Sequence, residues 1–219
     1  MRAHTRPLLD DVDLNDVARG DGYLFVRDGV GIAGRGVAAR VPLADVPSVL
    51  AAIEHVDEVG GVYPIALGVV PFEPGTPCEL VIPKVLVGKA ADGRRWVTVI
   101  DDTDHGIETA ARPLPRAQEF NVRPRTPVDH YLAAVTAARD AVRSGALTKA
   151  VIAREVEVVS PEPIDVHAVL LRLKAMFGRS YRYSYDGFIG ASPELLVAVR
   201  GNEVRSHPLA GTTPRTGDP

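Results

Sequence analysis

A glutamate between two apolar runs is the first residue of the chain that could do chemistry. Residues 188–196 have the sequence Phe-Ile-Gly-Ala-Ser-Pro-Glu-Leu-Leu, and Pro193 forces an extended bend between two strand-like halves. The bend would present the carboxylate of Glu194 at a break in a sheet. A carboxyl group in that position can transfer a proton, and it can equally be part of an exposed structural bend.

A loop of small residues follows shortly afterwards in the chain. Residues 206–212 have the sequence Ser-His-Pro-Leu-Ala-Gly-Thr and end in Ala210, Gly211 and Thr212. Bare backbone amides in such a loop can approach an anionic ligand closely. Taken singly, the bend and the loop are both explained by ordinary connections between strands, and composition alone favours that structural interpretation.

A lysine precedes a segment with strand periodicity. Between residues 150 and 159, Ile152, Val156 and Val158 alternate with residues that face the other way. This alternation predicts a strand over residues 150–159, with Lys149 at its start.

Hairpin signals and three helical patterns determine the predicted fold class. The dipeptides Asp-Gly and Gly-Asn separate short runs rich in Val, Ile, Tyr and Phe, at positions 28–29, 92–93, 186–187 and 201–202. Apolar residues recur at helical spacing over residues 43–56, 127–144 and 165–177. We therefore expect an α+β fold in which antiparallel β-sheets pack with helices.

The predicted helices have recognisable ends, and their histidine has no catalytic pattern around it. Thr126 is placed to cap the second helix and Gly145 to end it, while Gly178 ends the third. His167, near the start of the third helix, lacks the partners of a catalytic triad, so we expect a structural role. One domain over residues 1–219 is predicted, with an N-terminal sheet part (1–125) and a second part (126–219).

Composition excludes several classes of function. The net charge is -3, and the basic residues form no stripe or block, which argues against binding to nucleic acid or an anionic membrane. The N-terminus lacks a signal-peptide core, and the apolar run 65–70 is too short to cross a bilayer. A single cysteine, Cys78, excludes an internal disulfide and agrees with a reducing compartment. We expect a cytoplasmic protein.

Taken together, the bend and the loop favour a functional interpretation over the structural one. Residues 190–196 (Gly-Ala-Ser-Pro-Glu-Leu-Leu), followed by 208–212 (Pro-Leu-Ala-Gly-Thr), closely resemble the chorismate-binding enzymes, which include anthranilate, aminodeoxychorismate, isochorismate and salicylate synthases. Residues 145–154 are similar to the family segment in which a lysine precedes an apolar strand ending in arginine. The resemblance is strong over residues 128–219 and weaker before them, where residues 67–72 also look family-like.

Two positions point to a branch of that family. Lys149 stands where isochorismate and salicylate synthases carry lysine, and residues 192–195 have their Ser-Pro-Glu-Leu rather than the Ser-Pro-Glu-Arg common in the anthranilate branch. The resemblance implies that Lys149 takes a proton from an attacking water and that Glu194 protonates the departing ring hydroxyl. It also implies that Ala210, Gly211 and Thr212 bind the substrate chorismate.

The resemblance further implies a magnesium ion held by glutamates of a C-terminal half that is expected after Thr212. No metal ligand is assigned within the chain, which is expected to be an inactive fragment of an isochorismate synthase of menaquinone or siderophore biosynthesis. A salicylate synthase and a non-catalytic chorismate-binding remnant are the alternatives. The sequence leaves the oligomeric state open.

Overall fold

The structure is a computed structural model that describes residues 1–101, 107, 109 and 119–211. The chain forms two compact units, one of Met1–Pro113 with Asp165–Pro219 and one of Leu114–Ile164. In this division the last strands belong with the N-terminal ones. The single-domain organisation stays a prediction.

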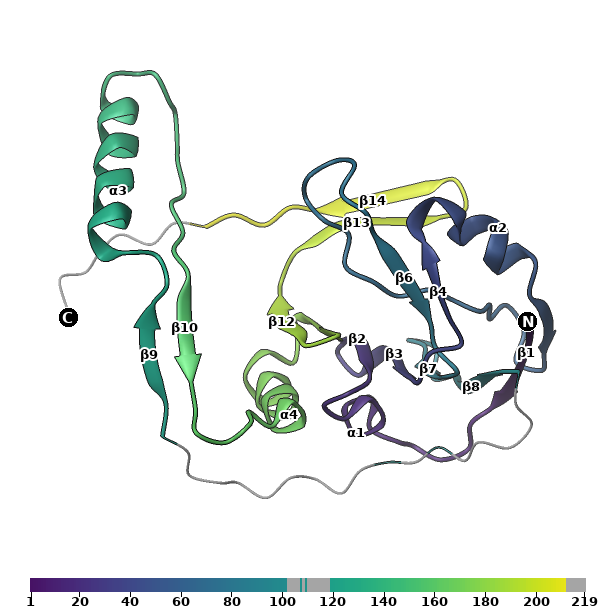
Figure 1. The fold of residues 1–219 in the computed structure, drawn as a ribbon. Helices are drawn as coiled ribbons and strands as arrows, with labels where there is room; N and C mark the ends of the chain where they lie inside the picture. Colours follow the sequence, from purple (N-terminus) through teal and green to yellow (C-terminus); the bar gives the residue numbers. More distant parts are fainter. Residues whose placement is uncertain (102–106, 108, 110–118, 212–219) are drawn as a thin grey trace. The chain divides into compact units, whose positions relative to one another are not determined.

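The first unit is built mainly from short strands (Figure 1). Its strands are β1 (Arg2–Pro7), β2 (Tyr23–Arg27), β3 (Val30–Arg35), β4 (Ala39–Pro42), β5 (Glu54–Asp57), β6 (Glu79–Ile82), β7 (Val85–Lys89), β8 (Arg95–Ile100), β11 (Tyr181–Tyr185), β12 (Phe188–Ser192), β13 (Leu195–Arg200) and β14 (Glu203–His207). Its helices are α1 (Leu14–Ala18), the 3-10 turn η1 (Leu43–Asp45), α2 (Val46–Ala51) and α4 (Val166–Phe177).

Eight of these strands form one sheet in the order β12-β11-β2-β3-β7-β8-β1-β5. Every neighbouring pair is antiparallel except β1 and β5. The pairs β4–β6 and β13–β14 form two further antiparallel sheets. The α+β class with antiparallel sheets and packed helices is confirmed.

All four predicted hairpin turns are present, since they join β2 to β3, β7 to β8, β11 to β12 and β13 to β14. The backbone explains why the sequence signal works. Asp28 and Gly29 both have positive φ (51° and 76°), as do Asp186 and Gly187 (44° and 82°). That is the combination which a two-residue hairpin turn requires and which aspartate and glycine tolerate.

One predicted helix of this unit is shorter than expected. The helix expected over residues 43–56 ends at Ala51, and residues 54–57 instead form β5, which pairs in parallel with β1. Sheet pairing here outweighs the helical spacing of the apolar residues. The apolar run 65–70 makes only an isolated bridge between Leu67 and Val81.

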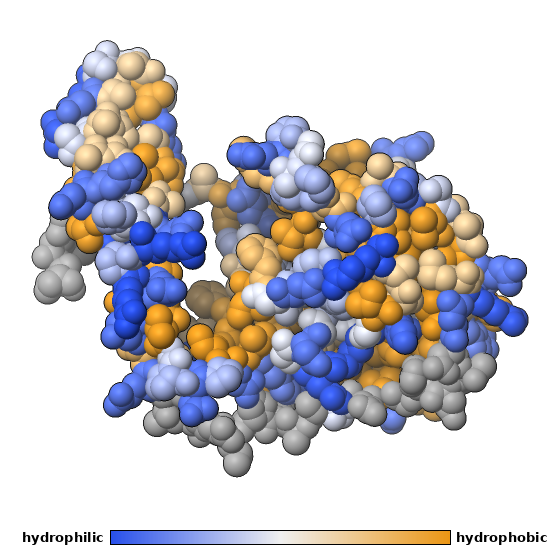
Figure 2. All heavy atoms as spheres, in the orientation of Figure 1, coloured by the Kyte–Doolittle hydropathy of each residue, from blue (hydrophilic) through white to orange (hydrophobic). Residues whose placement is uncertain are grey.

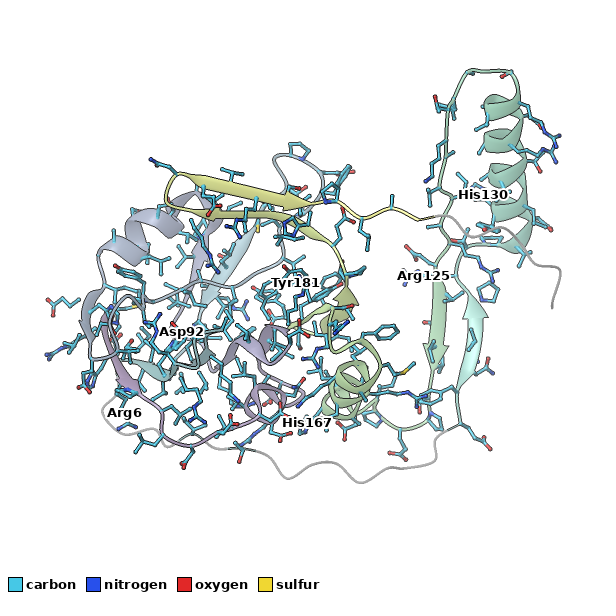
Figure 3. All side chains as sticks on the ribbon, turned by 180° about the vertical axis from the view of Figure 1, so that it is seen from behind. Arg6, Asp92, Arg125, His130, His167 and Tyr181 are labelled. Carbon is cyan, nitrogen blue, oxygen red and sulfur yellow. The ribbon has the colours of Figure 1, made fainter. Side chains whose placement is uncertain are left out.

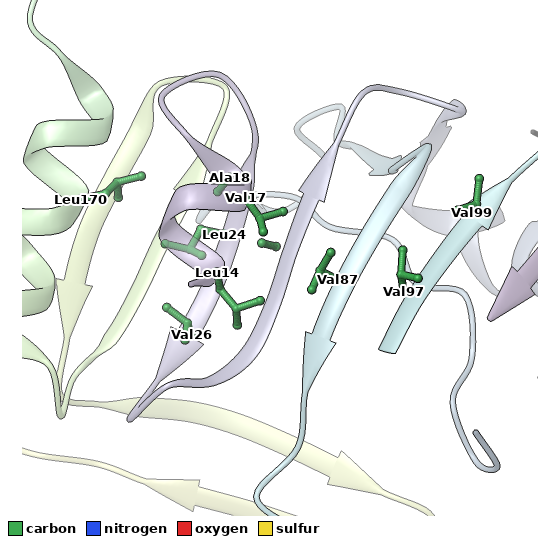
Figure 4. Packing of buried hydrophobic residues seen from close by; sticks show 10 residues of the cluster. Leu14, Val17, Ala18, Leu24, Val26, Val87, Val97, Val99 and Leu170 are labelled. Atoms are coloured by element: carbon green, nitrogen blue, oxygen red, sulfur yellow. The ribbon is translucent and has the colours of Figure 1, made fainter. Parts of the chain in front are cut away.

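The main core lies between the sheet and the helices α1 and α4 (Figure 4). Leu170 of α4 and Val17 of α1 are almost fully buried there against Val26 and Val87 of the sheet. The members of this cluster are Leu14, Val17, Ala18, Leu24, Val26, Ala33, Val87, Val97, Val99 and Leu170.

A second core covers the opposite face of the sheet. Ile100 belongs to it and alternates along β8 with Val97 and Val99 of the first core, so the two clusters lie on opposite sides. Its buried members are Ala3, Val41, Ile53, Ile82 and Ile100. This second core lies over the β1 and β8 end of the sheet, whereas Phe25 of β2 and Phe188 of β12 are 44% and 53% exposed.

Two polar contacts join α1 to α4. His167, labelled in Figure 3, is buried on α4, and its Nε2 lies 3.0 Å from Oδ1 of Asp16. Lys174 donates a hydrogen bond to Oδ2 of Asp13, the residue that caps α1. The contact of His167 with Asp16 thus helps to hold α4 against α1.

The second unit contains β9 (Asn121–Pro124), α3 (Val128–Arg143) and β10 (Val156–Val159). Gly145 ends α3 with a φ of 78°, as predicted, but Pro127 occupies the N-cap position without a side-chain hydrogen bond. The expected capping by Thr126 is wrong: its Oγ1 instead accepts a hydrogen bond from the Glu155 amide at 3.3 Å.

Apolar side chains are widely exposed on the second unit, and orange and tan atoms cover much of its visible surface in Figure 2. The exposed apolar residues include Val128, Leu132, Val135, Val142, Val151, Val156 and Val158. Among the described residues of both units, no helix is long and apolar enough to cross a membrane.

The Asp13–Lys174 contact predicts a pH-dependent contribution to stability. Burial alone would raise the pKa of Asp13, but hydrogen bonds from Asn15 and Lys174 outweigh it and lower that pKa from 3.8 to about 2. The ionised carboxylate therefore stabilises the fold above pH 3.8, and its contribution disappears as the pH falls toward 2. Asp13→Asn should lower the free energy of unfolding at pH 7 by about 2 kcal/mol.

Urea unfolding of both proteins between pH 7 and pH 3 measures this difference, which should shrink on acidification. Asp10→Asn, at an exposed position nearby, is the matched control and should leave stability unchanged. A deficit of Asp13→Asn that stays constant with pH would contradict the account.

Candidate active site

Glu194 lies on the bend between the edge strand β12 and the hairpin strand β13. Ser192 Oγ accepts a hydrogen bond from the Glu194 amide at 3.2 Å, so the serine side chain fixes the turn that the proline begins. The Glu194 side chain is exposed, and no ion-pair partner for it lies within the described part of the chain. The carboxylate is thus available to a ligand.

Packing explains why the residue two positions before Ser192 is a glycine. A Cβ on Gly190 would collide with the ring and hydroxyl of Tyr183 on the neighbouring strand β11. The Tyr183 ring also stacks on Phe188, with 5.2 Å between ring centroids. Gly190 therefore lets the aromatic pair close over β12, and the Gly-Ala-Ser-Pro-Glu segment depends on its partner strand.

The β13–β14 hairpin brings the bend and the small-residue loop to the same end. Leu195, directly after Glu194, is paired with His207, the last residue of β14. The chain leaves β14 at this point and continues through Ala210 and Gly211, which are both exposed. A Cβ on Gly211 would meet nothing within 4 Å, so the backbone here is open to a ligand. Thr212 lies outside the described residues.

Lys149 lies in the second unit, in an exposed segment between α3 and β10. The predicted strand start at this residue is wrong, because β10 includes only Val156–Val159. Its partner β9 ends at Pro124, and the chain then turns into α3, with the Arg125 amide donating to the Glu155 carbonyl. Within the described part of the chain, no strand pairs with residues 149–154.

The segment after Lys149 lies along α3 instead of in a sheet. Ala150 and Ile152 line a hollow together with Tyr131 and Val142 of the helix, while Val151 is 82% exposed. The alternation that suggested a strand therefore reflects packing against a helix face. Lys149 and Glu194 belong to different units.

No metal-binding group is apparent in the residues that the structure describes. Nowhere among them do three or more histidine, cysteine or acidic side chains converge as a metal ion requires. The acidic residues of the candidate site amount to Glu194 alone, which by itself does not fit a magnesium ion.

The sequence interpretation overlooked one residue with an unusual environment. Arg182 of β11 is 1% exposed and faces the α1 and α4 side of the sheet. The alternation of tyrosines around it, at positions 181, 183 and 185, is the signal that could have identified it, because it places Arg182 on the opposite face from three aromatic side chains.

With this geometry in view, the comparison with known proteins defines the class. Residues 76–219 match the family described as "Chorismate binding enzyme". The chain belongs to this family. The match includes the Glu194 bend, the loop after β14 and the Lys149 segment.

Two relatives within the family are named as isochorismate synthases. The chain is 34% identical over 198 residues to a Mycobacterium tuberculosis protein named "Putative isochorismate synthase MenF", covering 84% of this chain and 47% of that protein. It is 27% identical over 204 residues to isochorismate synthase DhbC of Bacillus subtilis, covering 84% and 48%. The chain thus spans about half the length of these curated relatives.

Solved structures support the fold. The structure of MenF, the menaquinone-specific isochorismate synthase from Escherichia coli, superposes with a TM-score of 0.63 at 14% identity, covering 90% of this chain and 51% of that one. At this identity the likeness concerns the fold alone.

The hydrogen bond at the bend yields a direct prediction. Ser192→Ala removes the acceptor of the Glu194 amide, so this amide should exchange with solvent roughly threefold to tenfold faster, the equivalent of about 1 kcal/mol. Amide hydrogen exchange followed by NMR measures the effect. Ser192→Thr keeps the hydroxyl and should preserve the wild-type rate; an unchanged rate in Ser192→Ala would show that Pro193 alone holds the bend.

Proposed function

We propose that this chain contributes the proton-transfer residues and part of the substrate-binding surface of an isochorismate synthase. The observation that carries the proposal is the β13–β14 register, which brings an exposed carboxylate and a loop of bare backbone amides to one end of a hairpin. The isochorismate synthases among the relatives support the choice of reaction.

In the proposed reaction a hydroxyl group is gained at one ring carbon and lost at another, and the electron pairs of the two ring double bonds shift toward the carbon that loses its hydroxyl. A water oxygen forms a bond to one ring carbon of chorismate, and Lys149, acting as a neutral amine, takes a proton from that water. The bond between another ring carbon and its hydroxyl breaks, and Glu194, acting as a protonated carboxyl, gives that oxygen the proton with which it leaves as water. One water enters and one departs, so the product is an isomer of the substrate.

Binding is assigned to the loop after β14. Backbone amides at Ala210 and Gly211 can donate hydrogen bonds to a substrate carboxylate, and the absence of large side chains lets the ligand approach the backbone. Thr212 is proposed to add its hydroxyl. These roles rest on the family resemblance and on the exposure of the first two residues.

Magnesium remains part of the proposal through the family resemblance. The described residues do not form a magnesium site, so no step of the reaction is assigned to the metal here. The metal requirement is tested by adding a chelator to the assay.

The natural full-length protein provides the test. Incubated with chorismate and magnesium, it should form isochorismate, detected by liquid chromatography and NMR. Lys149→Ala and Glu194→Ala should each lower kcat by at least about 100-fold, because each removes one of two required proton transfers.

Lys84→Ala and Glu162→Ala, at exposed positions outside the proposed site, are the controls and should retain wild-type turnover. Accumulation of salicylate and pyruvate would replace the proposal by the salicylate-forming alternative. Wild-type turnover in either site variant would refute the assigned role.

A further inference from the structure

A polar pocket of about 210 Å³ opens in the first unit, beside α1, α4 and the sheet. It is lined by Asp11, Asp13, Leu14, Asn15, Val26, Gly29, Lys89, Lys174 and Arg182. All of these residues belong to the same unit, so the pocket is complete within it. None of them has a role in the proposed reaction.

Arg182 is the unusual member of this pocket. Its side chain is 1% exposed, and Nε and Nη1 find no hydrogen-bond acceptor among the described residues. A guanidinium group always carries its charge in a protein, and burying a charge without partners is costly. Such a group needs an acceptor, and the described residues do not supply one.

The nearest carboxylates are engaged with other groups. Asp13 accepts hydrogen bonds from the amide and side chain of Asn15 and from Lys174, while Asp28 lies 3.7 Å from Arg27. Burial lowers the pKa of Arg182 below its ordinary value, and the charges of Asp13 and Asp28 only partly oppose this effect. Asp13 and Asp28 act on the Arg182 charge from a distance, without a hydrogen bond to it.

The charge balance of the pocket favours an anion. Lys89 is paired with Asp11 and Lys174 with Asp13, so each acidic residue is neutralised by a lysine. The positive charge of Arg182 is then not balanced by an acidic residue of the pocket lining. Asn15, which is 2% exposed, adds a buried Oδ1 without a partner among the described residues, and this atom can accept a hydrogen bond from a protonated ligand group.

We propose that this pocket binds a small anion through a carboxylate or phosphate group, with Arg182 as the principal donor. An unpartnered nitrogen of Arg182 would donate to the oxyanion, and charge-assisted hydrogen bonds of this kind are about twice as strong as neutral ones. The hydroxyl of a hydroxy acid or of a protonated phosphate would reach Asn15. The site would tie α1 to β11, the strand that pairs with β12 before the Glu194 bend.

The test is a titration of the ¹⁵N-labelled 219-residue chain followed by NMR. Inorganic phosphate and malonate are added separately at constant ionic strength, balanced with chloride, and the Nε–Hε signal of Arg182 is observed. A saturating shift is expected with at least one of the two anions, and the more effective one identifies the preferred group. No saturating shift with either anion overturns the proposal.

Arg182→Met assigns the signal and removes the donor. This variant should bind the effective anion at least roughly tenfold more weakly, and it is expected to fold because an apolar side chain of similar volume replaces a buried charge. Arg172→Met, at an exposed position on α4, is the matched control and should bind as the wild type does. Equal affinity in Arg182→Met overturns the proposal. If that variant does not fold, the wild-type titration decides.

Discussion

The structure of the candidate site depends on the insertion of β11 between β2 and β12. Residues Arg182–Ser184 pair with Leu24–Val26 on one side and with Ile189–Ala191 on the other. This long-range pairing joins the later part of the chain to its beginning and makes β12 an edge strand of the eight-stranded sheet. The Glu194 bend follows directly after β12, so the pairing of β12 with β11 determines where the bend begins.

The side chains of β11 have different surroundings on the two faces of the sheet. Tyr183 packs over Gly190 and stacks on Phe188, which explains why the segment leading to Glu194 contains a glycine. Arg182, on the opposite face, carries a buried charge toward the pocket beside α1. A buried charge seldom improves stability unless it has a partner. Its presence in the strand that positions the bend is therefore better explained by a ligand than by packing.

Sequence patterns predicted the parts of the fold that short-range chemistry determines. Asp28, Asp186 and Gly201 mark hairpins because their backbone conformations suit few other residues, and Gly145 ends α3 for the same reason. The patterns failed where distant partners decide. Residues 54–57 became a strand because β1 was available, and residues 149–154 pair with no described strand because β9 ends at Pro124.

The candidate site shows the same limits. The Glu194 bend and the loop at Ala210 and Gly211 were identified from local sequence, and only the register of β13 and β14 shows that they share one end of a hairpin. The tyrosines around Arg182 indicate which face of the sheet it occupies, but only the tertiary structure shows that it is buried without a hydrogen-bond acceptor for Nε and Nη1 among the described residues. Lys149 was recognised through the family likeness, although its predicted strand is absent. Local chemistry thus identifies candidate residues, and tertiary pairing decides which of them meet.

The central functional claim is that water is the nucleophile. It is tested most directly by the reaction of the natural full-length protein with chorismate in water enriched in ¹⁸O, followed by mass spectrometry of the product. The account predicts isochorismate that carries one ¹⁸O atom in its new hydroxyl group. Isochorismate without the heavy isotope would show that the hydroxyl migrates within the molecule, and it would contradict the roles proposed for Lys149 and Glu194.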